Sequence, residues 1–323
     1  MSHEIEEING AFQMAYAGEK PWHGLGTSVG NDLLPAEMMQ VAGLDWTVHK
    51  EDLVTSAGHP IPDKKGLVRS SDNKVLDIVG KDWNPVQNST AFSFFDEFIR
   101  EGGGMQMHTA GSLRGGQIVF ALAKVDDSFE LFGGDKVESY LLFTNPHKFG
   151  RAIDVRFTPI RVVCDNTLAF SLSQHDKNVV KLNHTKEFRA EDVKEMMGIA
   201  SFKLNKYKEM AEFLGSRLYS TDKVVQYFDE LFPTHSKKER NGSIVQSYEL
   251  STPAKRCMGL LETQPGSNFA RNSYWQAFNA VTFFTDHERG HTADSRLQSA
   301  WYGQSRNLKF NALQKAIEYA EAV

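Results

Sequence analysis

The chain has 323 residues, of which 41% are hydrophobic and 24% are charged. This is the composition of a globular protein with a sizeable core, in one large domain or two smaller ones. The sequence has no run of about 18 apolar residues and no basic start followed by an apolar stretch. It therefore predicts neither a membrane partner nor a secretion signal.

The net charge of −5 is unevenly spread along the chain. Residues 1–100 carry 8 basic and 15 acidic side chains, whereas residues 201–323 carry 16 basic and 13 acidic ones. The overall acidity argues against a nonspecific histone-like coat, but it leaves room for a local basic strip.

Only two cysteines occur, Cys164 and Cys257. Two thiols make neither a disulfide framework nor, by themselves, a structural zinc site, so we expect buried and reduced thiols in a cytoplasmic protein. Cys164 stands before Asp165 and Asn166, which suggests a thiol nucleophile. The simpler interpretation is a buried cysteine at the end of a strand.

Local patterns in the first 100 residues predict an arm followed by mixed structure. The predicted elements are an N-terminal arm at 1–43, a strand at 46–54, a hairpin at 66–79 and a helix at 88–100. The arm contains a Gly- and Pro-rich loop at 20–36, which Trp22 and Leu25 would hold to the body of the protein.

The middle of the chain is rich in strand patterns. Strands are predicted at 105–113, 117–125, 137–144 and 151–163. Arg114-Gly115-Gly116 joins the first two as a hairpin turn. The strand at 117–125 is apolar on both faces, which is typical of a strand in the centre of a sheet or at a contact between subunits. His147 is expected in a turn, and Asp165 or Asn166 is expected to cap a short helix through Leu172.

Helical spacing dominates the rest of the chain. Helices are predicted at 189–214, 221–231, 251–263, 270–288 and 304–322, with a polar connector at 237–242. Strands followed by helices favour an α+β fold. We expect a curved antiparallel sheet with packed helices in residues 44–188, and a helical region in residues 189–323 that packs on this core.

Several enzyme signatures are missing from the sequence. It contains no phosphate-binding P-loop, no Gly-x-Gly-x-x-Gly unit between a strand and a helix, no Gly-x-Ser-x-Gly elbow and no Cys-x-x-Cys pair. We therefore lean away from an enzyme and expect no cofactor.

One catalytic pattern is present, His287-Glu288-Arg289-Gly290-His291. On a helix its two imidazoles would fall one turn apart and bind zinc, and Glu288 would activate a water molecule. A third ligand at an established spacing is missing, and Gly290 weakens the helix. A zinc-dependent hydrolase is therefore kept as an alternative function, and no metal ligand is assigned.

Basic side chains recur in the strand-rich middle. Arg114 lies in the predicted hairpin turn and Lys148 in a connector, while one predicted strand carries Arg151, Arg156 and Arg161. Because guanidinium groups bind phosphate in a bidentate way, these residues would line a groove that follows a phosphate backbone. In the other interpretation, Arg156 pairs with acidic neighbours in the sheet.

A second basic segment interleaves lysine with aromatic residues. Lys203 and Lys206 alternate with Phe202 and Tyr207. Such a pattern fits a face that binds a nucleic-acid strand. It also fits a helix whose aromatic side chains enter the core while its lysines stay in solvent.

Several segments, taken in order, resemble the phage/plasmid-like family of unknown function, which occurs in phages, prophages and plasmids. The segments are PWHGLG at 21–26, VRSSDNKVLDIVGKDWNPVQNSTAF at 68–92, AGSLRGGQIVFALAKV at 110–125, LLFTNPHKFGRAIDVRFTPIRVVCDNTL at 141–168, LNHT at 182–185 and RNSYWQAFNAVTFFTDHERG at 271–290. The resemblance identifies as family-motif residues Trp22, His23, Gly24, Cys164, Asn166, Trp275, Asn279 and His287. The chain departs from the family pattern at 145–150, where His-Asp-Gly is expected, and at 271–275, where Arg-Gly-Thr-Ala-Trp is expected.

The resemblance implies a mobile-element protein in the cytoplasm of a bacterial host, but no activity. By analogy of architecture with single-strand annealing proteins, we expect ATP-independent binding of single-stranded DNA in annealing, recombination or replication. The expected partners are single-stranded DNA, further copies of the chain through the apolar strand at 117–125, and a host or phage protein. The alternative function is an interaction protein that modulates a host enzyme or defence system.

Overall fold

The computed structural model forms two compact units. Unit 1 comprises Met1–Asp127, Ser139–Thr158 and Phe170–Phe202, and unit 2 comprises Ser128–Glu138, Pro159–Ala169 and Lys203–Val323. The residues that the structure describes are 5–18, 25–102, 105–161, 166–167, 181–182, 205–234, 237–238, 244–245, 249–290, 299 and 303–323. The sequence-based division at 43 and 188 stays a prediction.

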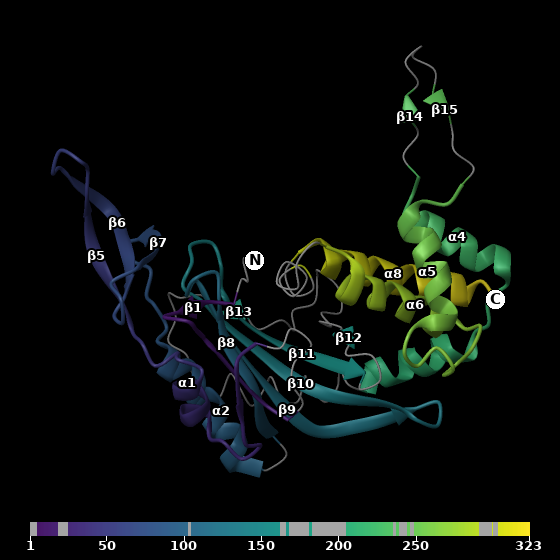
Figure 1. Cartoon of the computed structure of the whole chain (residues 1–323), viewed down its shortest axis with the longest axis horizontal. Helices are drawn as coiled ribbons and strands as arrows, with labels where there is room; N and C mark the ends of the chain where they lie inside the picture. Colours follow the sequence, from purple (N-terminus) through teal and green to yellow (C-terminus); the bar gives the residue numbers. More distant parts are fainter. Residues whose placement is uncertain are drawn as a thin grey trace. The chain divides into compact units, whose positions relative to one another are not determined.

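A large mixed sheet runs through the middle of the chain (Figure 1). Its strand order is β12-β11-β10-β9-β8-β3-β4, and β13 also pairs with β11. The strands are β3 (Met14–Ala17), β4 (Thr27–Val29), β8 (Met105–Leu113), β9 (Ile118–Leu131), β10 (Asp135–Pro146), β11 (Ile153–Arg161), β12 (Asn166–Thr167) and β13 (Lys181–Leu182). Together with the C-terminal helices, this sheet confirms the predicted α+β fold; its expected curvature stays a prediction.

The apolar strand of the sequence analysis, now β9, lies between β8 and β10. Its side chains from Ile118 to Ala123 are buried, so its apolar character is explained without a second subunit. The sheet is not antiparallel throughout, because β3 pairs antiparallel with β8 but parallel with β4. This parallel edge corrects the prediction.

Three smaller sheets accompany the large one. They are the pair β1 (Glu7–Ile8) and β2 (Ala11–Phe12), the three-stranded sheet of β5 (Val48–Val54), β6 (Pro60–Arg69) and β7 (Val75–Gly80), and the pair β14 (Lys237–Lys238) and β15 (Ile244–Val245). β6 is the middle strand of the three-stranded sheet and pairs antiparallel with both neighbours. The strand and the hairpin predicted here from alternation and from the turn at 71–73 are confirmed.

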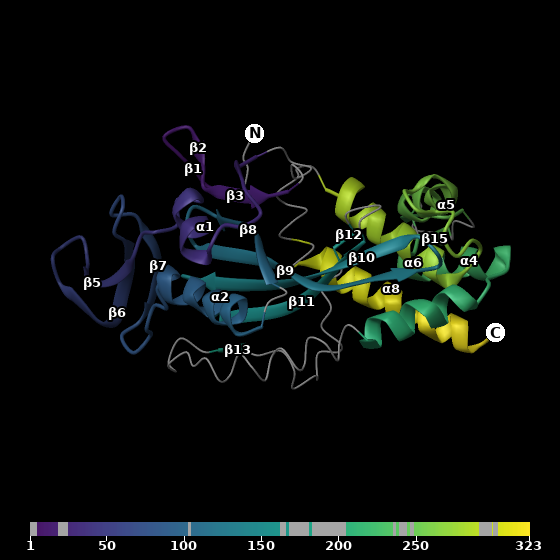
Figure 2. The same cartoon turned by 90° about the horizontal axis from the view of Figure 1, so that it is seen from below.

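The described residues of unit 1 also form two helices, α1 (Pro35–Val41) and α2 (Asn88–Gly102). Both lie against one face of the large sheet (Figure 2). Met38 of α1 and Phe92 and Phe95 of α2 are buried in one hydrophobic cluster with strand residues. The Phe95 ring meets that of Phe143 edge-on, with 5.9 Å between the centroids. The helical spacing of the phenylalanines therefore reports the face that packs on the sheet.

Unit 2 is mainly helical. Its helices are residues 205–216, α4 (Thr221–Leu231), α5 (Thr252–Thr263), α6 (Tyr274–Phe283), the π-helix η1 (Phe284–Glu288) and α8 (Gln304–Glu321). Ser220, Ser251 and Ser273 cap α4, α5 and α6, each accepting a hydrogen bond from a backbone amide of the first turn. The turn between β9 and β10 belongs to this unit, and its Phe132 ring contacts Trp275 of α6.

The described part of the predicted N-terminal arm contains β1 to β4 and α1, and the four residues of β3 pair with the distant β8. Two local predictions are wrong. Asn166 does not cap a helix, since Asn166–Thr167 pairs with β11. The polar connector at 237–242 contains β14, which pairs with β15. The predicted helical residues 189–204 lie outside the described residues. Among the residues that the structure describes, no helix is long and apolar enough to cross a membrane.

Candidate nucleic-acid interface

Two loops meet at one end of the large sheet. The turn at 114–117 joins β8 to β9, and the loop at 147–152 joins β10 to β11; we call them the interface loops. The His147 backbone N–H donates to the Gln117 carbonyl at 2.9 Å, and the Lys148 ammonium donates to the Gln117 side-chain oxygen at 3.4 Å. These bonds hold the two loops together. Arg114 lies in the first loop, and Lys148 and Arg151 lie in the second, so three of the basic residues that the sequence singles out belong to these loops.

The turn at 114–117 needs glycine. Arg114, Gly115 and Gly116 have φ values of 54°, 62° and 93°, in the left-handed region that favours glycine. A Cβ atom at Gly116 would lie 2.6 Å from a terminal nitrogen of Arg69. The missing side chain therefore lets the turn lie directly on that guanidinium group.

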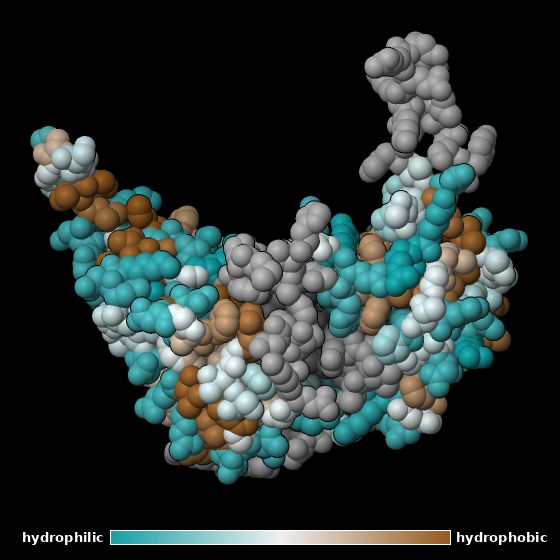
Figure 3. All heavy atoms as spheres, in the orientation of Figure 1, coloured by the Kyte–Doolittle hydropathy of each residue, from teal (hydrophilic) through white to brown (hydrophobic). Residues whose placement is uncertain are grey.

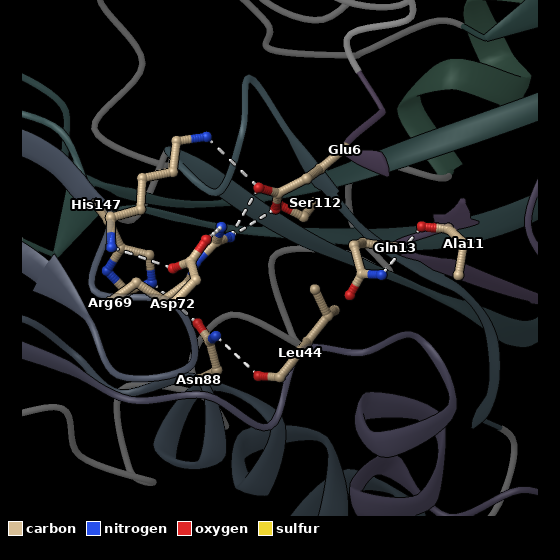
Figure 4. A network of polar contacts seen from close by, with 10 residues as sticks. Glu6, Ala11, Gln13, Leu44, Arg69, Asp72, Asn88, Ser112 and His147 are labelled. Atoms are coloured by element: carbon tan, nitrogen blue, oxygen red, sulfur yellow. Dashed lines mark hydrogen bonds and ion pairs between the residues drawn. The ribbon is translucent and has the colours of Figure 1, made fainter. Parts of the chain in front are cut away.

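Arg69 is the centre of a buried ionic network beneath the interface loops (Figure 4). Its side chain is only 1% exposed, and its Nη1 donates to both carboxylate oxygens of Glu6 at 2.8 Å. Its Nε and Nη2 donate to Asp72 at 2.9 and 2.6 Å. Ser112 of β8 donates a further hydrogen bond to Glu6 at 2.9 Å. The network thus joins the N-terminal segment, β6 and β8.

The electrostatics of the network favour its charged form. Hydrogen bonds from Arg69 lower the pKa of Asp72 from 3.8 to about 2. Burial lowers the pKa of Arg69, but hydrogen bonds to Asp72 and Glu6 outweigh this effect and raise it. The Arg69 guanidinium also lies over the Trp46 ring, 5.3 Å from its centroid.

A second buried polar group anchors the start of the loop at 147–152. His147 is buried, and its Nε2 lies 3.0 Å from the Asn88 side-chain oxygen. Asn88 donates in turn to the Leu44 carbonyl at 2.9 Å, as Figure 4 shows. Asn145 donates to the Val86 carbonyl at 2.8 Å. These bonds connect the end of β10 and the first residue of the loop at 147–152 to the start of α2 and to the residues just before it.

No described contact places the remaining predicted basic residues at the interface loops. Arg156 and Arg161 lie on β11, and their side chains, like Lys203, lie outside the described residues. Arg151 lies two residues before the first residue of β11, so it is not part of the strand that was predicted to carry all three arginines, which corrects the prediction. Lys206 begins the helix at 205–216 in unit 2 and lies 3.6 Å from Glu209.

Two of the described family-motif residues, Trp275 and Asn279, are buried in the core. Trp275 is buried and contacts the rings of Tyr207 and Phe278. Asn279 donates to the Trp275 carbonyl at 2.8 Å, one helical turn away. His287 stacks obliquely on Phe283, with 4.6 Å between the ring centroids. Trp22, His23, Gly24 and Cys164 lie outside the described residues, and Asn166 lies in β12. Cys257 is buried as expected, and burial raises the pKa of its thiol.

The His287–His291 pattern lacks the geometry that the zinc alternative needs. The helical run that contains His287 ends at Glu288, and Arg289 is extended, so the pattern does not begin on a helix that continues through Arg289. Arg256 donates two hydrogen bonds to the Glu288 carboxylate at 2.6 and 2.5 Å. His291 itself lies outside the described residues, and among those that are described no three His, Cys, Asp or Glu side chains are grouped to hold a metal ion.

Comparison with protein families gives one match. The family described as a domain of unknown function, DUF932, matches residues 75–307, well over half of the chain. The chain belongs to this family. The DUF932 match includes both interface loops, whereas Glu6 and Arg69 lie before it. Neither a curated protein nor a solved structure gives a significant match.

Sequence reasoning missed much of this arrangement. Arg69 and Asn88 lie in the family-like segment at 68–92, but neither they nor Glu6 were singled out as site residues. The loop residue Phe149 was not recognised either, although it is 60% exposed. The signal that could have found Phe149 is an aromatic residue between Lys148 and Arg151 in a loop expected to be polar.

Proposed function

We propose that the protein binds single-stranded DNA without ATP, through the interface loops, in annealing, recombination or replication in a phage or plasmid. The observation that carries the proposal is that Gln117 bonds the loop of Arg114 to the loop of Lys148 and Arg151. Arg and Lys side chains on neighbouring loops are suited to contacts with the phosphates of one strand.

The buried support of the loops strengthens this proposal. The Arg69 network lies under the turn at 114–117, and His147 fixes the second loop to Asn88. Loops held in this way lose little conformational entropy when they bind a ligand. Weak phosphate contacts on several copies of the chain would add to avidity, which is why the homo-oligomer remains part of the proposal.

The test measures binding of a fluorescently labelled oligothymidine over a range of salt concentrations. We expect the triple variant Arg114→Gln/Lys148→Gln/Arg151→Gln to bind more weakly at low salt. It should also lower the steepness of the salt dependence by about 2, since each phosphate contact to a single strand contributes about 0.7.

A matched control removes three positive charges elsewhere. Lys223, Lys255 and Arg271 are exposed residues of unit 2, so the variant Lys223→Gln/Lys255→Gln/Arg271→Gln has the same net charge as the interface variant. We expect it to bind as the wild type does. Equal losses in both variants would show that overall charge, not the interface, governs binding, and no binding by the wild type at micromolar concentration would refute the proposal.

A further inference from the structure

The three-stranded sheet β5-β6-β7 has two unlike faces. On one face, Leu67 and Val79 are buried in the hydrophobic core, and further out Lys65 pairs with Asp52. Register places Lys64, Gly66 and Ile78 on the opposite face, which we call the outer face. Gly66 itself is buried, whereas Ile78 is 51% and Val75 56% exposed on this face.

The outer face has an apolar group beside Gly66, and on β5 it also carries Glu51, the cross-strand partner of Gly66, in contact with His49. A Cβ atom at Gly66 would lie 3.3 Å from Leu53 and 3.8 Å from Val75, so these two side chains flank the glycine. Ile78 is the cross-strand partner of Gly66. Figure 3 shows hydrophobic residues gathered over this projecting sheet. An exposed apolar group of this kind marks a contact surface.

Phe149 of the second interface loop lies beside this face. Its backbone N–H donates to the Asp77 carboxylate of β7 at 2.8 Å, and the Lys64 ammonium lies 5.6 Å from its ring centroid. The ring is therefore held at the sheet although its side chain is 60% exposed. Lys148 and Arg151 flank it in sequence, and Lys64 adds a positive charge from the outer face.

We propose that Phe149 and the outer face take the bases of a single strand, while the cations of the interface loops and Lys64 contact its phosphates. This inference rests on the proposed function and adds the residues that would distinguish single-stranded DNA from a duplex. The positive charges beside the aromatic ring favour a nucleic acid over a second copy of this acidic chain as the occupant. Bases in a duplex are stacked on one another, so their faces are not available to Phe149.

The first experiment compares three probes of equal length: an oligothymidine, the corresponding abasic strand, and a duplex. The wild type should bind the oligothymidine most tightly. Phe149→Ala should weaken that binding about 5- to 150-fold, the range for loss of one base–aromatic stack, and should leave the salt dependence unchanged. Binding of the abasic strand should not change, because it offers no base to stack.

Two further variants keep the result interpretable. Phe149→Tyr preserves the ring and should bind as the wild type does, and Ile78→Ser should weaken oligothymidine binding without affecting the abasic strand. If Phe149→Ala binds all three probes like the wild type while the triple charge variant loses binding, the phosphate interface stands and base stacking is overturned. If the wild type binds no strand at all, both proposals fall. If only a protein partner requires the outer face, Phe149→Ala will leave DNA binding unchanged, and stacking is again overturned.

Discussion

Replacement of Arg69 by methionine should strongly destabilise unit 1. Methionine fills much of the same volume but leaves the Glu6 carboxylate, which is 4% exposed, without its bidentate partner. The remaining Glu6 contacts are the Ser112 hydroxyl at 2.9 Å and the Lys74 ammonium at 3.7 Å. Removing one partner of a buried ion pair costs about 3–5 kcal/mol. Loss of the Asp72 contact adds at most about 1 kcal/mol, because Asp72 is 37% exposed and can be solvated.

The assay is native-state hydrogen exchange of three backbone amides that report on this junction. The Glu6 amide bonds to Ser112, the Gln13 amide to Glu6, and the Ser112 amide to Gln13. We expect all three to lose protection in Arg69→Met. The control Lys74→Met removes a half-exposed cation from the same carboxylate and should cost at most about 1 kcal/mol.

A double-mutant cycle can refute the reasoning. If the cost of Arg69→Met comes from a stranded carboxylate, Glu6→Gln/Arg69→Met should be more stable than the sum of the single effects predicts, by about 1–3 kcal/mol. Additive losses would mean that Arg69 acts by packing against Trp46 and the turn at 114–117 instead of by compensating the charge of Glu6.

Two other predictions concern charged groups. In unit 2, Lys309 and Asp286 form a buried ion pair at 2.7 Å, so Lys309→Met should lower the free energy of unfolding by about 3–5 kcal/mol. The control Lys315→Met removes a cation whose partner Glu230 is half exposed, and it should cost at most about 1 kcal/mol. Equal losses of the two variants in thermal denaturation would contradict this prediction. Because the pKa of Asp72 falls from 3.8 to about 2 on folding, its stabilising contribution should be complete above about pH 4 and fade as the pH falls towards 2. Asp72→Asn should remove that part of the acid dependence, and an unchanged acid-unfolding profile would refute it.

The elements that the sequence predicts well are those whose signals are local. Residues 105–113 form β8 with the predicted bounds, because alternation and the glycines at 115 and 116 both report directly on backbone geometry. The helices of unit 2 agree with the predictions for the same reason, since apolar spacing reports a buried face and Ser220, Ser251 and Ser273 are capping residues at their starts. Nothing local distinguishes Met14–Ala17 from a loop, and only its distant partner β8 makes it a strand.

The same distinction between local and long-range signals explains which residues of the candidate site the sequence could indicate. Basic residues are visible in a sequence, so Arg114, Lys148 and Arg151 could be selected by charge and by their place near turns. That their two loops lie together depends on Gln117, whose backbone and side chain join the loops and whose role the sequence does not indicate. Glu6 and Arg69 are 63 positions apart, and their charges, read along the chain, suggest two solvated surface residues. Burial turns that pair into a support for the interface. A basic pattern alone therefore identifies candidate phosphate contacts. The surface that we propose for the bases depends on Phe149 and on Lys64 of the β5-β6-β7 sheet, which only the folded chain brings together.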